Sequence, residues 1–229
     1  MTTALDEIRS VDYRHFASPE HEKRAIKAPF PHVAPYSTLI AAIGNHWEPG
    51  CWESIKAMAD YTANICEYPL LLYEERDRCY NWGDALGSMR NMAINKAIYG
   101  GWQYLMMMDN DIQVGKDCLV RLLHRHLPII APIVAYTDGE THGLETPKLE
   151  RGKGVAMVGS VVLSCLLVRT SLFLPWALTG FFSNAIGDDE EYHFTRLFMA
   201  GHMPWIDTDV EVVAVKPPHF PLDTKRRAQ

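Results

Sequence analysis

The chain has 229 residues, of which 48% are hydrophobic and 22% charged, and its formal net charge is -6. Its length suits one sizeable hydrophobic core, and its composition is that of an ordinary globular protein, which excludes disordered and fibrous classes. The negative net charge supplies no long-range attraction to nucleic acid or to an anionic membrane, and so disfavours a DNA-binding protein.

Elements in the first part of the chain alternate between strand and helix. Residues 1–35 are rich in proline and charge and predict an N-terminal arm. Hydrophobic periodicity then predicts strands at 37–43, 69–73 and 102–108, and helices at 51–66 and 85–99. Gly100-Gly101 suits the end of the second helix. This order predicts right-handed crossovers and a mainly parallel sheet that is covered on both faces.

The remaining elements are less regular. A helix is predicted at 116–126, a strand at 128–135, a long loop at 136–154, one long strand or a bent pair at 155–168, a helix at 188–200 and an alternating strand at 206–216. We expect a single α/β domain over residues 36–220, followed by a C-terminal tail at 221–229.

Cysteine usage and hydropathy bear on the compartment. The five cysteines are widely spaced and form no Cys-x-x-Cys pair, which indicates reduced thiols in a cytoplasmic protein. The first ten residues lack the apolar core of a secretory signal, and no clean run of 18 apolar residues predicts a membrane span.

Two carboxylates, Asp109 and Asp111, directly follow the apolar segment 104–108 and flank Asn110. A buried strand would deliver them to the carboxyl edge of the sheet, where ligands bind in open α/β folds. Two carboxylates one residue apart can both reach one divalent ion, and hard oxygen ligands suit Mg²⁺ or Mn²⁺. The same residue types are also common in ordinary turns, which leaves a purely structural interpretation open.

Residues 104–114, which read YLMMMDNDIQV, resemble the acidic D-x-D segment of GT-A glycosyltransferases. Upstream, residues 88–91 (SMRN) resemble the A-R-N helix of that superfamily. Downstream, residues 187–192 (GDDEEY) resemble its G-E-D-x-x-F segment, and residues 217–219 (PPH) stand where a metal-binding histidine often follows the last strand. The resemblance covers roughly residues 37–220.

This resemblance implies a GT-A fold, in which a Rossmann-like, mainly parallel sheet with helices on both faces is joined to a smaller antiparallel C-terminal part. It implies Mn²⁺ or Mg²⁺ bound by Asp109, Asp111 and His219, and Asp189 as the catalytic base. The implied donor-binding positions are Ile43, Glu74, Arg90, Asp109, Asn110 and Asp188. The implied partner is a nucleotide-diphosphate sugar, UDP- or GDP-linked, with an unidentified hydroxyl acceptor; the acidic net charge counts against DNA as that acceptor.

The chemistry explains why such residues are needed. Transfer breaks the bond between an anomeric carbon and a diphosphate, so negative charge grows on the leaving group, and a bound cation stabilises that charge. An imidazole ligand such as His219 favours Mn²⁺. If the transfer inverts the anomeric centre, Asp189 would take the acceptor proton.

Simpler interpretations remain for each residue. Residues 188–191 also fit the acidic first turn of a helix, His219 could have a capping or core role, and Arg90 could lie on the surface of its helix. At the level of function, the alternatives are a metal-dependent nucleotidyltransferase and a catalytically silent GT-A-like protein that binds a sugar or nucleotide.

Overall fold

The computed structural model describes residues 36–44, 48, 50–66, 71–75, 82–136, 141–142, 149–159, 161–177, 181 and 201–215. The elements, in chain order, are β1 (Thr38–Ile43), α3 (Cys51–Cys66), β2 (Leu71–Glu75), α4 (Trp82–Gly100), β3 (Tyr104–Asp109), β4 (Ile112–Gln113), α5 (Cys118–His124), β5 (Ile129–Tyr136), β6 (Thr141–His142), β7 (Val155–Met157), β8 (Cys165–Arg169), η2 (Thr170–Trp176) and β9 (Trp205–Ala214). The predicted N-terminal arm, the helix predicted at 188–200 and the predicted C-terminal tail lie outside the described residues. No helix in the described ranges has both the length and the apolar character that crossing a membrane requires.

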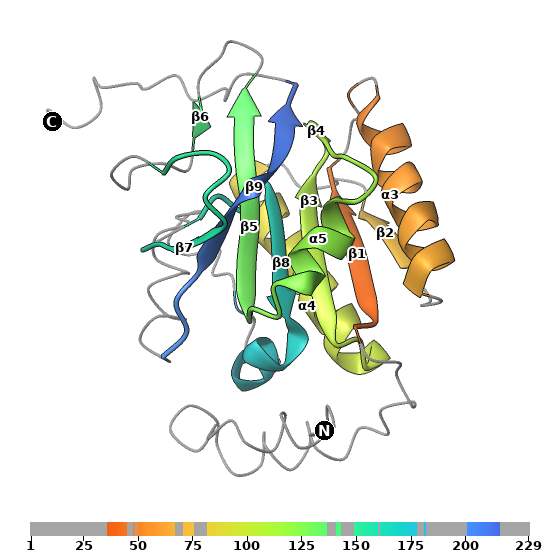
Figure 1. The fold of residues 1–229 in the computed structure, drawn as a ribbon. Helices are drawn as coiled ribbons and strands as arrows, with labels where there is room; N and C mark the ends of the chain where they lie inside the picture. The colour runs from red at the N-terminus through yellow and green to blue at the C-terminus, as the bar shows by residue number, and fades with distance from the viewer. Residues whose placement is uncertain are drawn as a thin grey trace, which may run out of the picture.

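One mixed sheet runs through the described part of the chain, in the order β2-β1-β3-β8-β5-β9-β4, with β6 beside β5 and β7 beside β9. β1 is parallel to both β2 and β3, and β9 is parallel to β5. β8 is antiparallel to its two neighbours, so β5 and β9 point the same way as β1, β2 and β3. The carboxyl ends of these five strands therefore lie at one edge of the sheet, at the top of Figure 1, which we call the carboxyl edge.

The alternation predicted for the first half of the chain is confirmed. All six residues of β1 are buried, as expected for a parallel strand that is covered on both faces. α4 ends where Gly101 takes a φ of 72°, and the Trp102 amide donates to the carbonyl of Ala97 at 3.0 Å. That hydrogen bond is typical of a Schellman motif, and it explains why the two glycines stop the helix.

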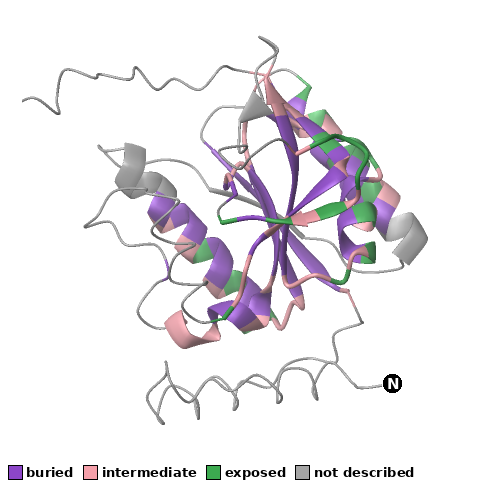
Figure 2. Ribbon diagram, turned by 60° about the vertical axis from the view of Figure 1, so that its left-hand side comes forward, coloured by how far each residue is buried: buried purple, intermediate pink, exposed green. Residues whose placement is uncertain are grey.

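A separate hydrophobic core fills each face of the sheet. Leu39, Ala41 and Ile43 of β1 contribute to the core under α4 and η2, whereas Ile40 and Ala42 contribute to the core under α3 and α5. Figure 2 shows the buried residues along the strands and on one side of each helix. The protein is thus a three-layer α/β structure with a mainly parallel sheet, and the predicted fold class is confirmed.

The segment 155–168 differs from the prediction of one long strand or a bent pair. β7 pairs with β9 near the edge of the sheet, whereas β8 lies between β3 and β5. An apolar run without a clear period does not reveal where the chain turns, and pairing partners distant in sequence leave no local signal. The predicted loop at 136–154 also contains the short strand β6, which pairs with β5.

Candidate functional site

The ends of β1, β2 and β3 lie side by side at the carboxyl edge. Ile43 pairs in register with Asp109 of β3 on one side and with Glu75 of β2 on the other. The Ile43 side chain is 1% exposed and packs in the core, so a ligand at this position would meet its backbone. The backbone of Glu74 pairs with Ala42, one position before the ends of both strands.

The predicted acidic residues lie together in the turn between β3 and β4. Asp109 is the last residue of β3, and Asn110 and Asp111 form the turn itself. All three are partly exposed. We call these residues the acidic turn; its position at the carboxyl edge is where open α/β sheets bind ligands.

Backbone hydrogen bonds from three separate segments hold the acidic turn. The Asp109 amide donates to the Ser164 carbonyl at 2.9 Å, the Glu48 amide to the Asn110 carbonyl at 3.3 Å, and the Val215 amide to the Asp111 carbonyl at 2.9 Å. These partners lie before β8, after β1 and after β9 respectively. All three bonds use main-chain atoms of the turn, so the surrounding segments fix its backbone from three sides.

Arg90, in α4, lies against the acidic turn with its side chain only 2% exposed. Its Nη2 atom is 3.4 Å from Oδ1 of Asp109, whose side chain is 21% exposed. A buried guanidinium needs oxygen atoms around it, because an uncompensated charge in the interior is costly. Arg90 thus orients the Asp109 carboxylate and brings one positive charge to the site, while its predicted contact with the donor stays a prediction.

Gly44 marks a close approach between the loop after β1 and the acidic turn. A Cβ atom at this glycine would lie 2.4 Å from both Cβ and Cγ of Asn110, and Gly44 has a φ of 154°. These distances are far below van der Waals contact, so only a residue without a side chain fits here unless the turn moves.

We therefore expect Gly44→Ala to lower the free energy of unfolding by about 1 to 3 kcal/mol, the usual cost of overpacking. Urea denaturation followed by circular dichroism measures it. Gly159→Ala is the matched control, because a Cβ there meets no atom within 4 Å, and it should stay within about 0.5 kcal/mol of wild type. A Gly44→Ala protein as stable as its control would show that the turn yields freely.

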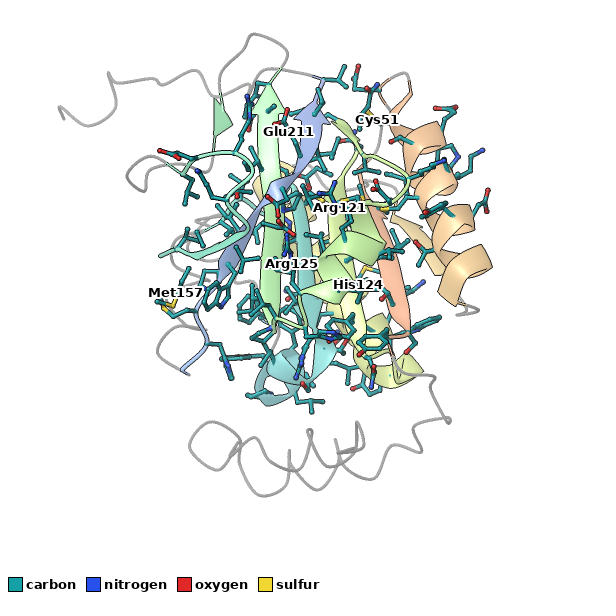
Figure 3. The ribbon with its side chains drawn as sticks, in the orientation of Figure 1. Cys51, Arg121, His124, Arg125, Met157 and Glu211 are labelled. Atoms are coloured by element: carbon teal, nitrogen blue, oxygen red, sulfur yellow. The ribbon has the colours of Figure 1, made fainter. Side chains whose placement is uncertain are left out.

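Thiols near the acidic turn are poor candidates for nucleophiles. Burial, together with the nearby Asp111 carboxylate, raises the pKa of Cys51 to about 11; Figure 3 shows this residue at the start of α3, near the carboxyl edge. A hydrogen bond with Cys118 and complete burial raise the pKa of the Cys165 thiol. Because the thiolate is the reactive form, these raised pKa values disfavour both thiols as nucleophiles.

Two carboxylates in the acidic turn fit a hard divalent cation. Mg²⁺ is usually bound through one or two protein carboxylates, with water and substrate phosphate oxygens as its other ligands. Asp109 and Asp111 would supply the two carboxylates of such a site. Within the described ranges there is no group of three or more His, Cys, Asp or Glu residues that could hold a metal, and His219, Asp188 and Asp189 lie outside these ranges.

No protein-family model and no curated protein sequence matches this chain. Solved structures do match: A197 from STIV gives a TM-score of 0.50 at 11% identity, over 77% of this chain and 84% of its own. The glycosyltransferase GalNAc-T7, solved with UDP, GalNAc and Mn²⁺, gives 0.51 at 9% identity over 80% of this chain. The chain adopts a GT-A-like fold. It spans 44% of the length of the GalNAc-T7 chain.

Within this GT-A-like fold, sequence reasoning located the acidic turn and Arg90 but missed the contacts that hold the turn. Glu48, Ser164 and Val215 act through backbone groups, which every residue type carries, so no motif could have revealed them. Gly44 did leave a signal, since a glycine at the end of a buried strand often marks close approach of another backbone segment.

Proposed function

We propose that this protein is a metal-dependent glycosyltransferase that moves a sugar from a nucleotide-diphosphate donor to a hydroxyl acceptor. The observation that carries the proposal is the acidic turn at the carboxyl edge of a GT-A-like sheet, with Asp109 and Asp111 both partly exposed. The likeness to GalNAc-T7, solved with UDP and GalNAc, supports a UDP- or GDP-sugar as donor.

We propose that Asp109, Asp111 and His219 bind Mn²⁺ or Mg²⁺, as the presence of Mn²⁺ with GalNAc-T7 supports. The cation would supply charge neutralisation at the diphosphate leaving group. His219 is four residues beyond Val215, whose amide donates to the Asp111 carbonyl. At most about 14 Å of extended chain separates these two positions, so the length of the chain allows His219 to reach the acidic turn.

Other residues of this protein are proposed to accept the proton of the acceptor and to contact the sugar donor. We propose that Asp189 accepts the proton of the acceptor hydroxyl, as an inverting transfer requires. Asp188, Asn110 and Glu74, with the backbone of Ile43, are proposed to contact the donor. Arg90 supplies positive charge beside Asp109, close to where the diphosphate would bind.

Thermal denaturation with a panel of nucleotides tests the proposal. We expect UDP or GDP to stabilise the protein only when Mn²⁺ is present, because the diphosphate and the carboxylates share the cation. A ligand at 100 times its Kd stabilises by about 2.7 kcal/mol, which is readily measured as a rise in Tm. The control is the same titration with EDTA. The proposal fails if no nucleotide diphosphate shifts the Tm under any metal condition.

A turnover assay then separates the three candidate functions. A glycosyltransferase releases nucleoside diphosphate from the donor, because even without its acceptor it transfers the sugar slowly to water. A silent relative binds the donor and releases nothing. A nucleotidyltransferase instead releases pyrophosphate from a nucleoside triphosphate and a sugar phosphate. Measurement of both products with purified protein therefore distinguishes the alternatives.

A further inference from the structure

Strand β9 changes its register against β5 half-way along. Trp205–Asp207 pair with 130–132 of β5, and Glu211–Ala214 pair with 133–136. Three residues, Thr208, Asp209 and Val210, therefore stand between the two halves of β9 without a partner position on β5. If Thr208–Val210 instead paired with the next three residues of β5, every later side chain of β9 would turn to the opposite face, because three is an odd number.

Arg125, the residue directly after α5, binds Asp207, the last paired residue before this insertion, and Asp209, the middle residue of the insertion. Its Nε lies 2.7 Å from Oδ2 of Asp207, and its Nη2 lies 3.0 Å from Oδ1 of Asp207 and 2.6 Å from Oδ2 of Asp209. The Asp209 amide donates to Oδ1 of Asp207 at 3.0 Å. We call these three residues the Arg125 cluster; Figure 3 shows Arg125 beside the middle of β9.

The burial of Asp207 explains why Arg125 is needed beside it. The Asp207 side chain is 0% exposed, so its charge must be matched by a cation or by hydrogen-bond donors. The pKa of Asp209 is held below its usual range by the Gly154 amide and by Arg125. The planar guanidinium serves two carboxylates at once, which the single ammonium group of a lysine cannot do in this geometry.

A turn before β7 closes the insertion from the other side. The Gly154 amide donates to Oδ1 of Asp209 at 3.1 Å, and the Thr208 amide donates to the Gly154 carbonyl at 2.7 Å. The Gly152 amide donates to the Thr208 carbonyl at 2.9 Å. The inserted residues are thus fixed in one conformation by side-chain and backbone bonds together.

The half of β9 that follows the insertion frames the acidic turn. Ala214 and Val213 pair with Ile112 and Gln113 of β4, directly after the turn, and the Val215 amide donates to the Asp111 carbonyl. At about 3.3 Å per residue, Val215 lies roughly 13 Å along the strand from Glu211, where the new register begins. The register set at the insertion therefore decides which backbone group meets Asp111.

We propose that Arg125 is a positioning residue for the acidic turn, acting through Asp207, Asp209 and the register of β9. The effect of Arg125 on catalysis rests on the proposed function, whereas its effect on the backbone of the acidic turn does not. In the sequence, the charges at 125, 207 and 209 look like ordinary surface groups. In the structure, they fix the register of the carboxyl half of β9.

The test is hydrogen exchange on the metal-free protein, comparing Arg125→Lys with Arg121→Lys. Arg121 lies on the same side of α5, but its bond to this region goes to the Asp209 carbonyl, which lysine can also reach. We expect the Val215 amide to exchange about tenfold faster in Arg125→Lys, with 38–43 of β1 unchanged, and less than about twofold faster in Arg121→Lys. Equal acceleration in β1, or none at Val215, overturns the proposal. If Arg125→Lys does not fold, Asp209→Asn, which keeps the Asp207 pair, is judged by exchange at Val215 and at 38–43 in the same way.

Metal titration provides the functional readout. We expect the Mn²⁺ affinity of Arg125→Lys to fall about tenfold, as for other residues that orient metal ligands, and that of Arg121→Lys to match wild type. If wild type binds no Mn²⁺, the proposed function fails while the exchange result still decides the positioning role. If wild type and Arg125→Lys bind Mn²⁺ equally, the positioning role for the site is wrong although the proposed function stands.

Discussion

Replacing Asp111 with alanine should abolish the Mn²⁺-dependent response to the donor and lower turnover by about a thousandfold, roughly 4 kcal/mol of transition-state stabilisation. Asp111 is partly exposed and its backbone is held through its carbonyl by Val215, so the substitution removes a carboxylate while the turn keeps its path. Release of nucleoside diphosphate at saturating Mn²⁺ measures turnover, thermal denaturation with and without Mn²⁺ measures the response to the donor, and urea denaturation shows that the fold is retained.

The control is Ser54→Ala, because Ser54 lies in α3, outside the acidic turn, and its hydroxyl bonds the backbone of Cys51 and Val114. It should keep the metal response. Retention of more than about a tenth of wild-type turnover by Asp111→Ala would remove this residue from the metal site.

Asp109→Ala should behave differently from Asp111→Ala, because Asp109 also faces Arg90. The Arg90 side chain is 2% exposed, and the substitution takes a carboxylate oxygen away from its guanidinium. Loss of a partner from a buried charged group costs about 1 to 3 kcal/mol or more, so we expect the metal-free protein to lose about 3 kcal/mol of stability. Urea denaturation in EDTA measures this loss directly.

Asp111→Ala is the control for that measurement, and we expect it to lose less than about 1 kcal/mol in EDTA. The double variant Asp109→Ala with Arg90→Met should recover part of the loss, since methionine fills the apolar space without a charge. Equal stability of the two single variants would mean that the Arg90 contact contributes nothing to folding.

The parts of the fold that could be predicted from the sequence are those with local causes. The helices α3 and α4 follow from apolar spacing, and the end of α4 follows from Gly101, whose φ of 72° suits glycine. The acidic turn could be found because a buried strand, two carboxylates and an asparagine are neighbours in sequence. Its roles in metal and donor binding stay predictions, as do those of Asp189 and His219.

The parts that could not be predicted depend on contacts between distant residues. β8 enters the sheet between β3 and β5 in the opposite direction, and only the completed sheet selects that position. Arg125 and Asp207 are 82 residues apart, and an isolated charge in a sequence carries no information about its partner. The donor contact of Arg90 stays a prediction, and its burial against Asp109 follows from how α4 packs on the sheet, which no local pattern reveals.

Main-chain hydrogen bonds from three segments hold the acidic turn, so the side chain at Asp111 can change while these bonds remain. A substitution there would change the ligands of the proposed cation and would keep the main-chain bonds from Ser164, Glu48 and Val215. Asp109 lacks this freedom because of Arg90. Directed evolution of a new metal preference should therefore start at residue 111, where the side chain can change while the backbone of the turn is retained.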